Sequence, residues 1–160
     1  MQPLVTAVII DDHPFFRDGV SRGLSQSGRI RVLGDAGDGT SGLALIRSAQ
    51  PDVAVVDYQM PGLTGVDVAH AVARDQLPTK VLLLSAVTDA PIVFAALEKG
   101  ASGYLSKEAG RDEIVAAVTR VANGETVVPP ALAAGLVGEI RAHARSDGPT
   151  LSDRERQVLS

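Results

Sequence analysis

The sequence predicts an α/β fold in which five parallel strands, in the order 2-1-3-4-5, form a sheet with helices on both faces. Short, largely apolar runs alternate with stretches of helical period along the chain, and the connections between them are short. The run VAVVD, residues 53–57, is apolar until its last residue, which is typical of a parallel strand that helices cover on both sides. A C-terminal linker helix is expected to follow this domain.

The predicted strands are short, and most of their residues are apolar. They span Val5–Ile10, Ile30–Ala36, Val53–Asp57, Lys80–Ser85 and Ser102–Lys107. The first helix, Phe15–Leu24, is amphipathic and is entered through Pro14 near its first turn. The second helix, Thr40–Ala49, must stop near Pro51 because proline cannot continue a helix.

The remaining three helices have equally clear ends. A loop rich in proline and glycine, QMPGLTG, leads into the helix Val66–Arg74. The next helix, Pro91–Lys99, is closed by Gly100 at the position where helices favour a left-handed residue. The last helix of the domain, Arg111–Ala122, ends at an Asn-Gly pair.

The chain changes character after this last helix. The predicted divisions are residues 1–125 for the main domain, 126–150 for a linker helix and linker, and 151–160 for the start of a truncated second domain. The linker helix, Ala131–Arg145, is rich in alanine and follows a Pro-Pro break. Ser152 and Glu155 form a capping box, which indicates that a new helix begins there.

The composition narrows the classes of function. The 160 residues include no cysteine, so disulfides and thiolate metal sites are excluded, and a reducing cytoplasm is expected. A net charge of −4, with two tyrosines and three phenylalanines as the only aromatic residues, argues against a nucleic-acid surface on this chain. No apolar run approaches the length of a membrane span and the N-terminus lacks a signal pattern, so no membrane partner is expected.

Polar side chains stand where the predicted strands end. Asp11 and Asp12 follow the first strand, and Asp57 ends the third. Ser85 ends the fourth strand and Lys107 the fifth. Ligands of open α/β sheets bind beyond these ends, at the point where the strand order reverses. Three carboxylates are therefore expected to converge on one crevice, beside a hydroxyl and an ammonium group.

Such a crevice suits a divalent cation and a phosphoryl group. Clustered carboxylates repel one another unless a cation shares the site, and an all-oxygen pocket suits Mg²⁺. Asp57 is the expected nucleophile toward phosphorus, because it ends a central strand and opens the Pro/Gly loop. Lys107 would neutralise one phosphoryl oxygen, and the Ser85 hydroxyl would donate a hydrogen bond to another.

Four motifs lie in order at these strand ends: DDHPFFRDGV at 11–20, DYQMPGLTG at 57–65, LLLSA at 82–86 and GYLSK at 103–107. Over about residues 4–125 they resemble the receiver domain of bacterial two-component response regulators, in the branch with a LuxR-type (NarL/FixJ-type) DNA-binding output. The segment LSDRERQVL at 151–159 resembles the first helix of that output domain.

The resemblance implies a CheY-like version of the flavodoxin fold and a switch controlled by phosphorylation rather than an enzyme. A sensor histidine kinase would phosphorylate Asp57 and thereby control a DNA-binding transcription regulator. DNA would be bound by the missing output domain and not by this fragment. A phosphorylation-dependent homodimer is left open.

The resemblance also implies roles for single residues. The implied Mg²⁺ ligands are Asp12, Asp57, the main-chain carbonyl of Gln59 and, through a water molecule, Asp11. Lys107 matches the family's active-site lysine. Ser85 would move toward the phosphoryl group, and Tyr104 would change rotamer in response.

Glu108 and His13 stand next to predicted site residues. Many receivers have proline after the lysine, whereas this chain has Glu108, and a cis bond without proline costs about 2.5–4 kcal/mol. The sequence does not determine the conformation of this bond. His13 is interpreted as a helix-start residue, because no second histidine lies at ligand spacing. His70 and His143 are expected on helix surfaces.

Two alternatives stay open at this point. One is a Mg²⁺-dependent phosphohydrolase that forms an aspartyl phosphate, although Gln59 stands where a general base would be needed. Turnover of a generic phosphate ester would favour it. The other is a flavodoxin-like cofactor module, which the scarcity of aromatic residues and the lack of a hydroxyl-rich phosphate loop disfavour. A colourless purified protein would count against a bound flavin.

Overall fold

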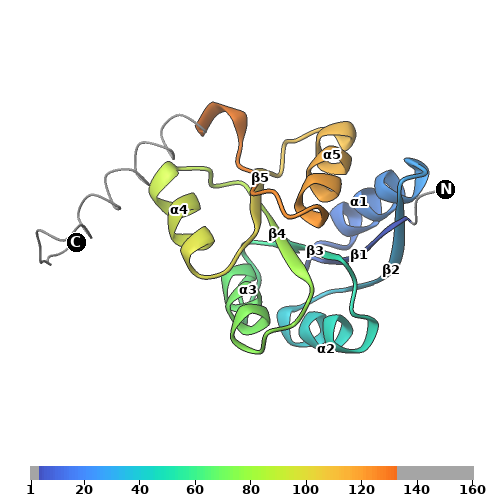
Figure 1. Cartoon of the computed structure of the whole chain (residues 1–160), viewed down its shortest axis with the longest axis horizontal. Helices are drawn as coiled ribbons and strands as arrows, with labels where there is room; N and C mark the ends of the chain where they lie inside the picture. Colours follow the sequence, from blue (N-terminus) through green and yellow to red (C-terminus); the bar gives the residue numbers. More distant parts are fainter. Residues whose placement is uncertain (1–3, 133–160) are drawn as a thin grey trace, which may run out of the picture.

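The computed structural model describes residues 4–132 of the chain, and its five strands form one parallel sheet in the order β2-β1-β3-β4-β5 (Figure 1). The strands are β1 (Val5–Ile10), β2 (Ile30–Ala36), β3 (Val53–Asp57), β4 (Lys80–Ser85) and β5 (Gly103–Ser106). The helices are α1 (Pro14–Gln26), α2 (Gly39–Ala49), α3 (Gly65–Arg74), α4 (Ala90–Glu98) and α5 (Arg111–Ala122). The predicted fold class is confirmed.

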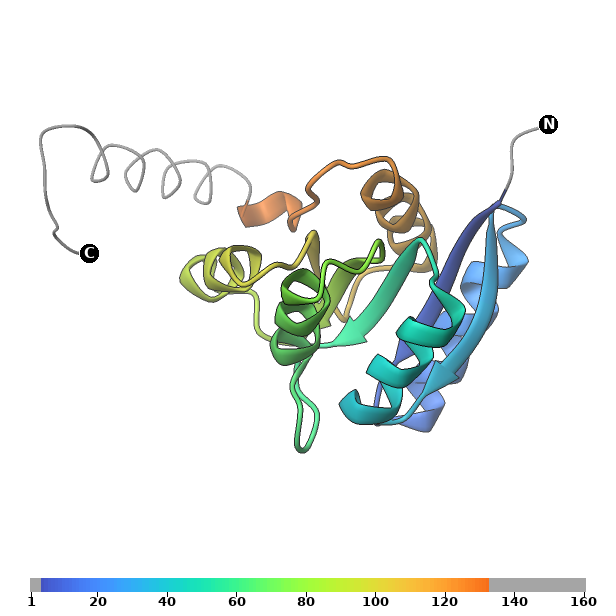
Figure 2. The ribbon, with the colours of Figure 1, turned by 60° about the horizontal axis from the view of Figure 1, so that its bottom comes forward.

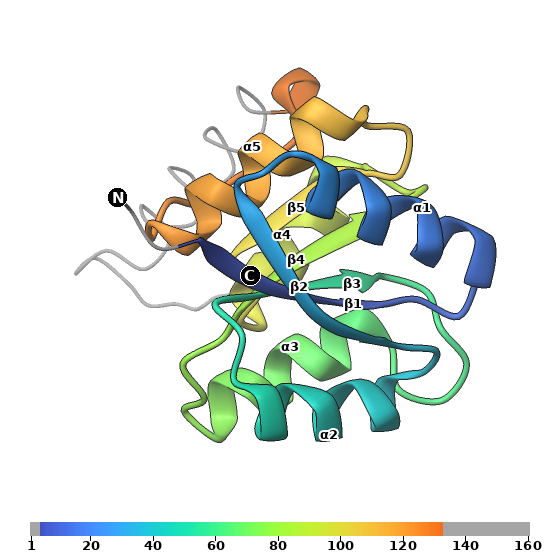
Figure 3. The same ribbon diagram turned by 90° about the vertical axis from the view of Figure 1, so that its right-hand side faces the viewer.

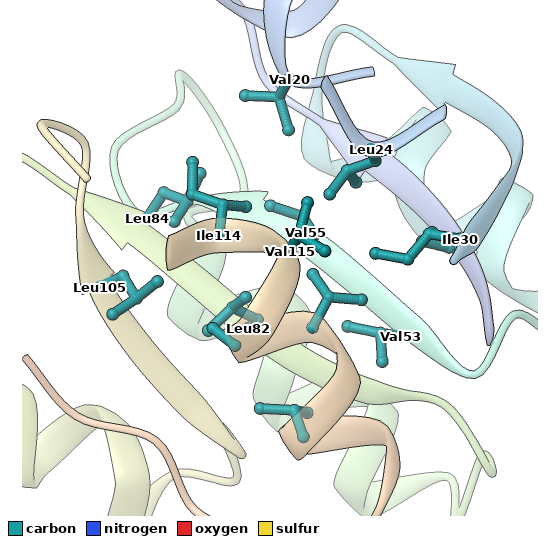
Figure 4. Packing of buried hydrophobic residues seen from close by; sticks show 14 of the residues in the cluster. Val20, Leu24, Ile30, Val53, Val55, Leu82, Leu84, Leu105, Ile114 and Val115 are labelled. Carbon is teal, nitrogen blue, oxygen red and sulfur yellow. The ribbon is translucent and has the colours of Figure 1, made fainter. Parts of the chain in front are cut away.

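The helices cover both faces of the sheet. Helices α1 and α5 lie on one face, and α2 and α3 lie on the other (Figure 3). On the first face, Leu24 of α1 and Val115 of α5 belong to one buried cluster with Val55 of β3 and Leu82 of β4 (Figure 4). On the second face, α4 joins α2 and α3 through the buried side chain of Val93. Every residue of β3 is buried, as expected for a central parallel strand.

The element boundaries follow the local signals in the sequence closely. Helix α1 begins at Pro14, in the first turn where a missing N–H costs nothing, and continues two residues beyond the predicted end. A capping box of Thr64 and Asp67 begins α3. Gly100, with φ of 123°, follows α4 as expected.

The segment after α5 returns to the sheet. It passes from α5 toward α4 (Figure 2) and places Val127 beside Gly103 at the free edge of β5. The Tyr104 N–H donates a hydrogen bond of 2.9 Å to the Val127 carbonyl. Pro130–Leu132 then forms a short 3-10 helix. The rest of the predicted linker helix, residues 133–145, and the predicted second domain lie outside the described residues.

No helix among residues 4–132 is long and apolar enough to cross a membrane.

Candidate functional site

Three carboxylates converge beyond the ends of β1 and β3, where the strand order reverses. Asp11 and Asp57 are 2% and 4% exposed, and Asp12 is half-buried beside them. One ligand atom from each of these residues and one from His13 lie within 4.8 Å of one another. The predicted convergence of the carboxylates is therefore present in the folded chain.

Backbone contacts hold Asp11 at the end of its strand. Its N–H donates a hydrogen bond of 3.0 Å to the Ala36 carbonyl at the end of β2. Arg17 of α1 donates through Nη1 to the Asp11 carbonyl at 2.7 Å, and its Nε lies 3.2 Å from Asp35 Oδ1. Arg17 thus ties the first turns of α1 to the ends of two strands.

Asp57 ends β3 at the centre of the sheet. Its register partner on β4 is Leu84, and the Tyr58 N–H donates to the Leu84 carbonyl at 2.8 Å. The Gln59 N–H donates to Asp57 Oδ1 at 3.2 Å, which orients the carboxylate. Gln59 thus lies beside Asp57, and the predicted role of its main-chain carbonyl as a ligand stays a prediction.

Lys107 supplies the positive charge opposite these acids. Its Nζ lies 3.1 Å from Asp57 Oδ2 and 3.3 Å from Asp11 Oδ2. The ammonium also lies 4.7 Å from the centroid of the Phe16 ring, a cation–π contact. The Lys107 N–H donates to the Ser85 carbonyl, and all described peptide bonds, including Lys107–Glu108, are trans.

Burial raises the pKa of Asp57 above its ordinary value. The Asp11 carboxylate raises this pKa further, whereas Lys107 and the Gln59 N–H partly offset the rise. The folded state therefore holds the Asp57 proton more tightly than the unfolded chain does. Consequently, the free energy of unfolding falls as the pH rises from the ordinary pKa of an aspartate to the raised pKa of Asp57 in the folded protein.

Replacing Asp57 by asparagine is expected to stabilise the metal-free domain at pH 7, because the buried negative charge is removed. A gain of about 1 kcal/mol would raise Tm by roughly 4 °C in a domain of this size. Thermal unfolding in the presence of a chelator measures the change in Tm. The increase in Tm should become smaller as the pH falls below the pKa of Asp57 in the folded protein. Asp112→Asn, at a side chain that is 99% exposed, is the control. A lower Tm for Asp57→Asn would contradict the prediction.

The side chains of Ser85 and Tyr104 both bind the backbone of Val87. The Val87 N–H donates to Ser85 Oγ at 2.9 Å, and the Tyr104 hydroxyl donates to the Val87 carbonyl. The Tyr104 side chain is fully buried, and burial raises its pKa. The sequence predicts that the Tyr104 ring moves inward when Ser85 moves toward the phosphoryl group. In this structure the ring is already in a buried position.

His13 is the residue whose position sequence reasoning missed. It precedes α1 as its N-cap residue, but its side chain makes no capping hydrogen bond. Its ring nitrogen Nδ1 lies instead 3.1 Å from Asp11 Oδ1, 3.1 Å from Asp12 Oδ1 and 3.7 Å from Asp57 Oδ2. His13 thus lies at the start of α1 as predicted, and its place next to Asp11 and Asp12 in the sequence is the signal for its contact with the carboxylates.

Comparisons with known proteins identify the family of this chain. Residues 7–119 match the family model described as the response regulator receiver domain. The "Probable transcriptional regulatory protein NarL" of Mycobacterium tuberculosis strain H37Rv is 52% identical over 156 residues, which cover 98% of this chain and 72% of that protein. The "Nitrate/nitrite response regulator protein NarL" of Escherichia coli K12 is 33% identical, over 99% of this chain and 74% of that protein.

Solved structures show the same likeness. The signal receiver domain of NarL from Mycobacterium tuberculosis superposes with a TM-score of 0.76 at 50% identity and covers 78% of this chain and 100% of that chain. A LuxR-family two-component response regulator from Aurantimonas sp. SI85-9A1 has a TM-score of 0.80 at 25% identity, over 87% of this chain and 99% of that chain. The chain thus belongs to the response regulator receiver domain family, and its relatives place it among the phosphorylation-controlled regulators of the NarL (LuxR-family) type.

Proposed function

We propose that Asp57 is the residue that accepts the phosphoryl group, and that Lys107 and Ser85 assist the transfer. The observation that carries this proposal is the state of Asp57 Oδ2. This oxygen is buried at the end of the central strand and accepts no hydrogen bond from the described residues. The Lys107 ammonium lies 3.1 Å away, so a balancing positive charge stands beside the oxygen that would form the new bond.

The transfer would proceed with Asp57 Oδ2 as nucleophile. An electron pair of this oxygen forms the new O–P bond, and the bond between phosphorus and the leaving group of the donor breaks. Lys107 would stay beside the phosphoryl oxygens and neutralise part of their charge. The Ser85 hydroxyl, now an acceptor for the Val87 N–H, would donate a hydrogen bond to another phosphoryl oxygen.

The donor set fits a divalent cation such as Mg²⁺. Two buried carboxylate oxygens, Asp12 Oδ1 and Asp57 Oδ2, have no hydrogen-bond partner among the described residues, and both belong to the four-residue cluster. Asp12, Asp57 and the Gln59 carbonyl would hold the ion directly, and Asp11 through water. The ion would supply positive charge to the acids and to the phosphoryl oxygens.

Intact-mass spectrometry tests this function. After incubation with acetyl phosphate and Mg²⁺, a single phosphoryl adduct is expected on the 160-residue chain. It should be absent in Asp57→Asn and after chelation of the metal, and should remain in the exposed-site control Asp112→Asn. An adduct on Asp57→Asn would refute the assignment, and turnover of a generic phosphate ester would favour a hydrolase.

The contacts at Val87 suggest how phosphorylation reaches the surface. If the phosphoryl group draws the Ser85 hydroxyl away from the Val87 N–H, Val87 keeps its hydrogen bond with the Tyr104 hydroxyl but loses the one with Ser85. Tyr104 is in turn bonded through its backbone to Val127, beyond α5. We expect phosphorylation to shift the amide NMR signals of both valines, and unchanged signals would exclude this route.

An exposed aromatic side chain beside the site offers a place for the kinase to dock. The Phe15 side chain is 94% exposed, and it borders an apolar pocket of about 290 Å³ between α1 and the start of α5. Phe15→Ser is expected to slow phosphoryl transfer from a sensor kinase without changing the reaction with acetyl phosphate. If the kinase phosphorylates the parent and Phe15→Ser at equal rates, Phe15 is not part of the interface with the kinase.

The remaining organisation follows the family. Residues 1–125 would form the receiver domain, 126–150 the linker and 151–160 the beginning of the output domain, most of which is absent from this chain. We expect no sequence-specific DNA binding by residues 1–160, and a selective gel shift would overturn this expectation. A cytoplasmic location and a phosphorylation-dependent homodimer also stay predictions.

A further inference from the structure

The side chain of His13 points into the carboxylate cluster although most of its surface is open to solvent. Its side chain is 63% exposed, whereas those of Asp11 and Asp57 are 3% exposed. Its Nδ1 lies within ion-pair distance of the carboxylates of Asp11, Asp12 and Asp57.

Hydrogen bonding accounts for only part of this position. Nδ1 is within hydrogen-bond distance of Asp11 Oδ1, at 3.1 Å. A single N–H at Nδ1 cannot point at three oxygens, and Asp12 Oδ1 and Asp57 Oδ2 indeed have no hydrogen-bond partner among residues 4–132. Asp57 is 4% exposed, so one of these unpartnered atoms is deeply buried and is aimed at the cluster. Lys107 provides charge there from one side only.

A metal ion would supply a partner to the two carboxylate oxygens that hydrogen bonding leaves without one. In an octahedral complex with bonds of about 2.1 Å, neighbouring ligand atoms lie roughly 3.0 Å apart, and in a tetrahedral complex they lie somewhat farther apart. The separations of His13 Nδ1 from Asp12 Oδ1 and Asp57 Oδ2, the two carboxylate oxygens without a hydrogen-bond partner among residues 4–132, are 3.1 and 3.7 Å. Nδ1 and these two oxygens are thus spaced as ligands around one ion, while Asp11 Oδ1 accepts a hydrogen bond from the His13 backbone N–H.

We propose that His13 Nδ1 is a direct ligand of the divalent ion, so that this receiver has a mixed nitrogen and oxygen site that prefers a first-row transition-metal ion to Mg²⁺. Imidazole suits transition ions, whereas Mg²⁺ prefers oxygen. This inference rests on the proposed function, because it concerns the same metal site. His13 would bind as the neutral ring with its proton on Nε2, toward solvent.

Electron spin echo spectroscopy of the Mn²⁺-loaded chain tests the proposal. A ¹⁴N coupling from a bound imidazole is expected in the parent protein and in His70→Asn, a control at an exposed position of α3. The coupling should disappear in His13→Asn while Mn²⁺ stays bound. Calorimetric titration should show Co²⁺ affinity weakened by about tenfold or more in His13→Asn, with Mg²⁺ affinity changed by less than about threefold.

The outcomes separate this proposal from the function on which it rests. If Mn²⁺ binds and no ¹⁴N coupling is seen in the parent, His13 is not a ligand, and the phosphorylation of Asp57 with Mg²⁺ is unaffected. Equal Co²⁺ affinity in parent and His13→Asn likewise overturns the inference alone. If neither ion binds and acetyl phosphate gives no adduct, the proposed function itself fails, and the inference fails with it.

Discussion

Lys107→Ala is expected to slow phosphorylation of Asp57 by acetyl phosphate by about 100-fold or more. The Lys107 ammonium lies within 3.3 Å of carboxylate oxygens of both Asp11 and Asp57. Removing a preorganised charge of this kind from a buried site costs roughly 10²–10³ in rate, because no water dipole replaces it equally well. The rate is measured by intact-mass spectrometry over time at fixed Mg²⁺.

The geometry of Lys107 explains why its loss is not easily compensated. Its N–H donates to the Ser85 carbonyl, and its side chain, which is 19% exposed, holds the ammonium between the Phe16 ring and the acids. Arginine at this position would spread the same charge over a larger planar group, so Lys107→Arg should restore the rate only in part.

Lys99→Ala provides the matched control, because Lys99 is exposed at the end of α4, and among residues 4–132 the lysine that pairs with the clustered carboxylates is Lys107. It should phosphorylate at the parent rate. A Lys107→Ala rate within about threefold of the parent would show that the ammonium does not act in the transfer, whatever its proximity.

Gly65→Ala is expected to destabilise the domain by about 2–3 kcal/mol, which corresponds to a Tm lower by roughly 10 °C. Gly65 is the first residue of α3, and its N–H donates to the Tyr58 carbonyl at 3.0 Å. An added Cβ would overlap the backbone carbonyl oxygen of Asp57 and lie 2.8 Å from Leu83 Cδ2. The backbone at Asp57 belongs to the central strand and cannot retreat without breaking its pairing with β4.

Helix propensity alone predicts that Gly65→Ala stabilises the domain, which is the opposite effect. Alanine is favoured over glycine in a helix by about 1 kcal/mol, so a gain in stability would be expected if the contact were unimportant. Gly19→Ala in α1 isolates that effect, since nothing lies within 4 Å of the added Cβ. It should raise stability by about 0.5–1 kcal/mol. Thermal unfolding of the two variants should therefore shift Tm in opposite directions, and equal shifts would contradict the steric account.

Gly65 also connects the fold to the function. The close approach of α3 to the end of β3 sets the path of the loop that follows Asp57. A displaced loop would move the Gln59 N–H that orients the Asp57 carboxylate. Because of the same clash, we expect folded Gly65→Ala protein to be phosphorylated more slowly than the parent.

Much of this architecture could be predicted because its causes are local in the sequence. The apolar run before Asp57 and the Pro/Gly loop after it identify a central strand and its turn without knowledge of any distant residue. Strand–helix alternation then permits few topologies, and the crossover rule brings the ends of neighbouring parallel strands to one edge. The predicted meeting of Asp11, Asp57 and Lys107 follows from that placement alone.

The return of the chain after α5 could not be predicted in this way. Val127 lies beyond the predicted domain boundary, and its neighbours resemble a linker in composition. Its bridge to Gly103 exists because β5 is an edge strand with free backbone groups, which only the assembled sheet presents.

The amino-acid sequence by itself determined the order of the elements, the sheet topology and the set of chemical groups at the strand ends, because periodicity and turn chemistry act between near neighbours. Only the tertiary structure decided that Lys107 Nζ lies 3.1 Å from Asp57 Oδ2 and that the Tyr104 hydroxyl lies beside the Val87 carbonyl. Both contacts join residues that are far apart in the sequence and that only folding brings together.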